Sequence, residues 1–106
     1  MAWLVLFVAG VLEVVWAYAM KLSDGFSRPG PAVVTMVAMF LSFGLLALAM
    51  KSLPLGTSYM VWTGIGAVGA FVVGVVVLGE AVTVTRLLAA VLIVAGIVLM
   101  KVSTPA

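Results

Sequence analysis

The stretch AWLVLFVAGVLEVVWAYAM, from Ala2 to Met20, contains a single charged side chain, Glu13. An apolar run of this length is sufficient to cross a bilayer as a helix. At 1.5 Å per residue, a helix beginning near Ala2 places Glu13 roughly 16 Å along its axis, slightly past the middle of the membrane. A charge at that depth costs about 2.5–3.5 kcal/mol or more. Packing does not require such a residue, so we interpret Glu13 as a binding site for a cation, a proton, or each in turn.

The rest of the chain repeats this pattern of long apolar runs bounded by charges. Of its 106 residues, 67% are hydrophobic and 8% are charged, whereas soluble domains carry about 25% charged residues. Charges separate uncharged stretches at 29–50, 52–79 and 87–100. We therefore expect an all-α integral membrane protein of one domain, residues 1–106, with four transmembrane helices at about 2–22, 32–51, 57–78 and 84–102.

Several functional classes lack the residues that they need. The sequence has no cysteine and no histidine, and it shows no metal-ligand cluster, no nucleotide-binding loop and no nucleophile–base pair. Its five basic residues are dispersed over helix ends and form no patch for nucleic acid. We expect neither an enzyme nor a protein with a metal or cofactor, and no nucleic-acid partner.

The distribution of positive charge does not fix the orientation of the chain. With four crossings, Lys51 and Lys101 lie on one side, and Lys21, Arg28 and Arg86 lie on the other. This bias is too small for the positive-inside rule. Either the insertion machinery decides, or the chain inserts both ways and pairs antiparallel. The sequence shows no internal repeat, and an antiparallel homodimer would supply the inverted repeat that transporters use.

Gly10, Glu13 and Trp16 share one face of the first predicted helix because they are three residues apart. Gly10 leaves room either for a ligand or for a neighbouring helix. Trp16 lies deeper than interfacial tryptophans usually do. We expect its ring to attract a cation, although core packing is an alternative. No basic residue lies mid-helix to pair with Glu13.

The second and third predicted helices contribute further polar and aromatic candidates. Ser42 is expected to bond either the carbonyl of Ala38, one turn earlier, or the carboxylate of Glu13. Tyr59 and Trp62 share a face, and Tyr59 either holds a carboxylate through its hydroxyl or anchors the helix at the interface.

Small residues mark two further features. Gly64, Gly66 and Gly69 either bend the third predicted helix or allow close packing, and the sequence alone does not separate these alternatives. In the fourth predicted helix, a seam for dimerisation is expected at Ala89, Leu92, Ile93 and Gly96.

Three stretches and one residue together resemble the small multidrug resistance family over essentially the whole chain. They are GVLEVVWA at 10–17, LPLGTSY at 53–59, WTGIG at 62–66, and Lys101. Trp16 and Ser42 are similar to the guanidinium-exporter branch of that family. Ser58 and Met60 depart from it, since alanine is expected at both positions, and this leaves the fine substrate preference open.

The resemblance implies an antiparallel, dual-topology homodimer in the bacterial cytoplasmic (inner) membrane that exchanges guanidinium ions for protons. Glu13 would bind both, within a frame whose members are Gly10, Trp16, Ser42, Tyr59 and Trp62. The glycines of the third helix would bend it, and the fourth helix would form the dimer seam. Release of protons by both carboxylates of a dimer would move two protons for each guanidinium.

Chemistry favours a guanidinium substrate over the alternatives. A planar guanidinium donates two parallel hydrogen bonds to a carboxylate and stacks on indole. The sister function, export of hydrophobic quaternary ammonium compounds, would leave Ser42 unused because those cations donate no hydrogen bonds. A proton-carrying ring subunit or a structural membrane peptide is a third alternative, but ring subunits hold their carboxylate on a two-helix hairpin.

Overall fold

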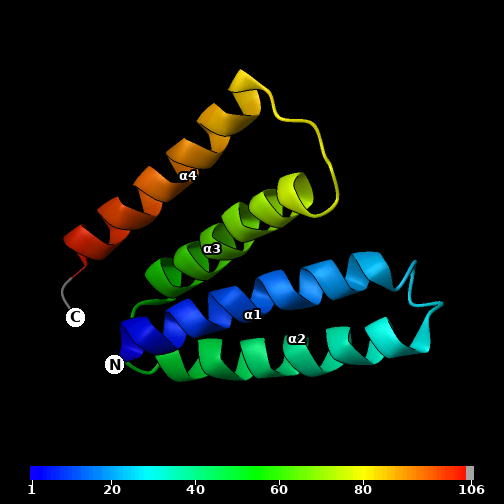
Figure 1. Cartoon of the computed structure of the whole chain (residues 1–106). Coiled ribbons are helices and arrows are strands. Elements are labelled where there is room, and N and C mark those ends of the chain that lie inside the picture. Colours follow the sequence, from blue (N-terminus) through cyan, green and yellow to red (C-terminus); the bar gives the residue numbers. More distant parts are fainter. Residues whose placement is uncertain (105–106) are drawn as a thin grey trace.

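A computed structural model describes residues 1–104 of the chain. They form four helices in the order α1 (Ala2–Leu22), α2 (Pro29–Ala49), α3 (Leu55–Val76) and α4 (Val84–Ser103), with no strand among the described residues (Figure 1). Each helix is long and apolar enough to cross a membrane. The all-α membrane architecture predicted from the spacing of the charges is therefore confirmed.

The helix ends depend on prolines and caps that the apolar runs do not reveal. Helix α2 begins at Pro29 rather than Ala32, because proline is well accommodated in the first turn of a helix. Helix α3 begins directly after the extended residue Pro54. Helix α4 begins after Thr83, whose hydroxyl accepts a hydrogen bond from the backbone N–H of Arg86.

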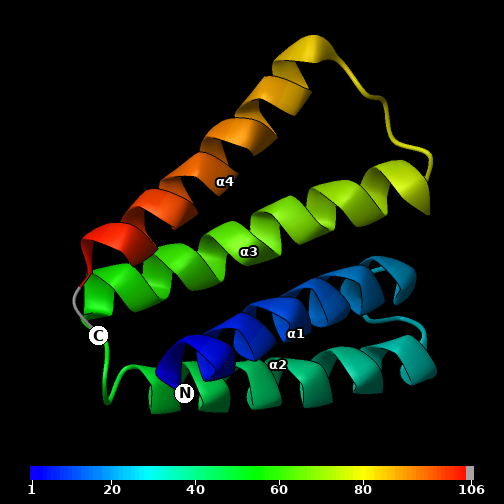
Figure 2. The same ribbon diagram turned by 60° about the vertical axis from the view of Figure 1, so that its left-hand side comes forward.

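The first three helices form a packed unit, and the fourth is attached at one end. Helix α1 packs against both α2 and α3, whereas the backbone of α4 approaches only that of α3. Figures 1 and 2 show α4 close to α3 at the end of α4 and diverging from it toward the loop 77–83. Thr57 and Thr104 share a hydrogen bond of 3.2 Å between their hydroxyls at the closed end. Helix α4 has no buried residue.

Glycines bring α1 and α3 into close contact. A Cβ atom placed on Gly10 would lie 2.7 Å from Cγ2 of Ile65, and one placed on Gly69 would meet the side chain of Val14. The side chain of Ile97 of α4 likewise occupies the space beside Gly64. Such close approach at small residues is the usual means of packing membrane helices. Helix α3 runs unbroken past its glycines, so close packing is the role that they have in this conformation.

Candidate functional site

Glu13 lies against the backbone of α3 because residue 66 has no side chain. A Cβ atom on Gly66 would overlap the carboxyl group and would lie 2.8 Å from Cγ of Glu13. One carboxylate oxygen, Oε1, is buried and has no hydrogen-bond partner among the described residues. A buried polar atom without a partner is costly. The structure thus presents an acceptor oxygen in the middle of a membrane-spanning helix that a cation or a proton would satisfy.

Ser42 connects all three packed helices one turn away from Glu13. Its hydroxyl donates to the backbone carbonyl of Ala9 at 2.7 Å and accepts from Nε1 of Trp62 at 2.9 Å. Both expected partners, the carbonyl of Ala38 and the carboxylate of Glu13, are therefore wrong. In an α-helix the carbonyl of Ala9 also accepts the backbone N–H of Glu13. Ser42 and Trp62 thus position the helical turn that carries Glu13.

An aromatic row borders the site and includes Phe43, which the sequence analysis did not single out. The Phe43 ring stands edge-on to Trp16, with centroids 6.5 Å apart, and edge-on to Trp62 at 5.7 Å. The Tyr59 ring lies 5.6 Å from that of Trp62. Phe43 follows Ser42 directly, and this adjacency was the available signal. The structure brings side chains from three helices into one continuous row, Trp16–Phe43–Trp62–Tyr59.

The ends of this row differ in their exposure. Nε1 of Trp16 is buried and, like Oε1 of Glu13, has no partner among residues 1–104. Tyr59 is 52% exposed, and its hydroxyl makes no hydrogen bond within the described part of the chain. It therefore does not hold Glu13 in this conformation. The side chain of Ile65 occupies the space beside Gly10. The structure therefore supports helix packing, rather than room for a ligand, as the role of Gly10.

The four seam residues on α4 do not all face the same way. Ile93 approaches Gly64, at 3.3 Å from an added Cβ, and Gly96 lines a groove between α4 and α3. Ala89 borders another groove beside α3, whereas Leu92 is 63% exposed. Within one chain, part of the expected seam is directed toward α3.

Four membrane-spanning helices, one of which carries an intramembrane carboxylate oxygen with no partner among the described residues, define a small, multi-pass membrane protein of the transporter class. Comparison with known proteins narrows this class to one family. Residues 1–93 match the family described as Small Multidrug Resistance protein, and the chain belongs to that family.

Individual relatives cover nearly the whole chain. It is 57% identical over 104 residues to the "Guanidinium exporter" of Escherichia coli (strain K12), covering 98% of this chain and 99% of the relative. Proteins of the same name match at 55% identity from Yersinia pseudotuberculosis, covering 98% of this chain and 100% of the relative. That of Salmonella typhimurium is 53% identical, with 97% and 98% covered.

Proposed function

We propose that this chain exports guanidinium ions across the bacterial cytoplasmic membrane in exchange for protons. The observation that carries the proposal is the buried oxygen of Glu13 on a membrane-spanning helix, which has no hydrogen-bond partner in the part of the chain that the structure describes. Relatives more than half identical over nearly their full length are named as guanidinium exporters. This supports guanidinium, rather than a hydrophobic quaternary ammonium compound, as the exported cation.

Glu13 is proposed to bind guanidinium or a proton, but not both at once. The two oxygens of a carboxylate match two parallel N–H donors of a guanidinium. Trp16, one turn along α1, offers an indole face for the planar cation. A proton on the carboxyl removes the charge that attracts the cation. Mutually exclusive occupancy, with exchange between the two faces of the membrane only when the site is occupied, gives antiport.

The neighbouring residues are proposed to hold Glu13 and the cation in place. Ser42 and Trp62 fix the turn of α1 through the carbonyl of Ala9. Trp16 and Tyr59 close the two ends of the aromatic row, and Gly10 permits the close contact between α1 and α3. In this proposal, helix α3 also bends at Gly64, Gly66 and Gly69 when the site switches its opening from one face of the membrane to the other, because small residues allow packed helices to shift.

An antiparallel homodimer is proposed as the working unit. Helix α4 has no buried residue and its backbone contacts only α3, so most of its apolar surface is free for a second copy. Ala89, Leu92, Ile93 and Gly96 are proposed as the seam, with the two copies inserted in opposite orientations. Two such chains would supply the inverted repeat that alternating access requires.

The experiment that tests the proposed function is electrogenic transport by the purified protein in liposomes under an imposed proton gradient. If both Glu13 carboxylates of a dimer release their protons, two protons move for each guanidinium and each cycle carries net charge. We therefore expect current with guanidinium and little with tetraethylammonium. Glu13→Gln should abolish the current while leaving the cross-linked dimer intact. Glu80→Gln, which removes a carboxylate in the exposed loop 77–83, is the matched control and should transport normally. Current from the Glu13→Gln variant, or preference for tetraethylammonium, would refute the proposal.

A further inference from the structure

A groove outside the proposed transport site lies where α1 begins and α4 ends. It has a volume of about 260 Å³. Its lining side chains come from α1, α3 and α4, and all are apolar or aromatic except that of Lys101; among them are Trp3, Phe7, Val61, Ile65, Val98 and Lys101. Phe7 and Val98 are more than half exposed. In a chain that crosses the membrane, this groove opens toward lipid.

Lys101 stands over the groove and has no acidic partner among residues 1–104. Its Nζ atom lies 5.0 Å from the centroid of the Trp3 ring, which is a favourable position for a cation over an indole face. Among residues 1–104, the ion pair present joins Arg86 to Glu80, in and beside the loop 77–83. No acidic side chain in the described part of the chain neutralises Lys101, so its positive charge can attract an external anion.

Among the described residues, the charged side chains at this end of the molecule are basic. Figures 1 and 2 show that the start of α1, the α2–α3 loop and the end of α4 lie together. This end holds Lys51 and Lys101. The three acidic side chains of the sequence lie elsewhere: Glu13 is in the middle of α1, and Asp24 and Glu80 are in the loops at the opposite end. An anion at this end meets attraction and no opposing carboxylate side chain.

We propose that this groove binds an anionic phospholipid, with the phosphate on Lys101 and part of an acyl chain in the apolar groove below it. Trp3 positions the ammonium group and lies at the interfacial depth that suits an indole. The groove is separate from the proposed dimer seam, because it uses the end of α4 beyond Gly96. In an antiparallel dimer one such site would lie in each leaflet.

Quenching of Trp3 fluorescence by brominated lipids tests this site. The intact protein is reconstituted in phosphatidylcholine vesicles containing brominated phosphatidylglycerol or brominated phosphatidylcholine. Subtracting the signal of Trp3→Phe isolates Trp3 from Trp16 and Trp62. One lysine near the surface contributes about a fivefold preference for an anionic lipid. We therefore expect the quenching of Trp3 to report that the groove binds phosphatidylglycerol about fivefold more tightly than phosphatidylcholine.

Substitutions then assign the preference to one side chain. Lys101→Gln should reduce the preference to about onefold, and Lys101→Arg should preserve it. Lys51→Gln removes a charge at the same end but outside the groove, so it should leave the preference unchanged. Equal quenching of the wild-type protein by both lipids would overturn the proposal, as would a preference that survives Lys101→Gln.

Discussion

The contact between Glu13 and Gly66 leads to the sharpest prediction. Replacing Gly66 with alanine adds a Cβ atom that overlaps the Glu13 carboxyl group. Because the added atom meets a side chain rather than a backbone, the helices can stay packed if the carboxyl group moves. We therefore expect Gly66→Ala to displace the binding group and leave the fold in place.

The magnitude follows from two opposing contributions. Insertion of a methyl group into a packed contact costs about 1–3 kcal/mol, and alanine favours a helix over glycine by about 1 kcal/mol. The free energy of unfolding should therefore fall by at most about 2 kcal/mol. Binding does not share the gain in helix propensity, so a cost of about 1–3 kcal/mol should lower guanidinium affinity about 5- to 150-fold, given that 1.4 kcal/mol is a factor of ten.

Gly44→Ala is the matched control, since the same substitution in α2 meets no atom within 4 Å. Guanidinium affinity is measured at equilibrium by the fluorescence of Trp16 and Trp62, and separately from the rate of transport. An unchanged affinity in Gly66→Ala would refute the inferred position of Glu13. If transport were also slower in that variant, Gly66 would be assigned to the bend alone.

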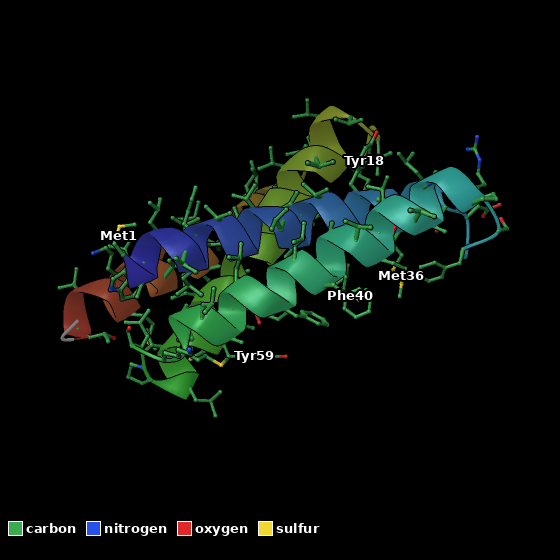
Figure 3. All side chains as sticks on the ribbon, turned by 90° about the horizontal axis from the view of Figure 1, so that it is seen from below. Met1, Tyr18, Met36, Phe40 and Tyr59 are labelled. Atoms are coloured by element: carbon green, nitrogen blue, oxygen red, sulfur yellow. The ribbon has the colours of Figure 1, made fainter. Side chains whose placement is uncertain are left out.

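Three further predictions follow from a hydrogen bond, two ring contacts and an ion pair in the structure. Ser42→Ala leaves the buried Nε1 of Trp62 without a partner, so the free energy of unfolding should fall by about 1–3 kcal/mol; a loss of equal size in a Trp62→Phe background would contradict this. Phe43→Leu removes two edge-on ring contacts and should weaken guanidinium binding more than Phe40→Leu, whose ring is 66% exposed and points away from the bundle (Figure 3). Arg86→Gln removes a partly exposed ion pair of 3.9 Å and should change thermal stability by less than about 1 kcal/mol; a larger loss would show that this loop supports the fold.

The membrane architecture could be predicted because it depends on the spacing of charges along the chain. Four apolar runs separated by charges specify four spans whatever the tertiary packing. The exact ends could not be predicted in the same way, since the run that begins at Pro29 does not reveal that the proline is already helical. The family resemblance read from Gly10–Ala17 and the other motifs is confirmed by the match over residues 1–93.

The site was predictable where a residue is unusual by itself and not where it depends on helix register. Glu13 stands out because a charge is costly at its depth. The partners of Ser42 could not be predicted, because the carbonyl of Ala9 and the indole of Trp62 reach it only through the packing of three helices. Phe43 resembles the many apolar residues around it until the rings on each side are placed in space.

The central claim is that guanidinium and protons compete for Glu13, and proton release on binding tests it most directly. Guanidinium is added to the purified protein in weakly buffered solution over a series of starting pH values, and released protons are measured with a pH indicator. The account predicts release that saturates with guanidinium binding in the wild-type protein and is absent in Glu13→Gln. Binding of guanidinium without proton release at every pH, or equal release from Glu13→Gln, would contradict it.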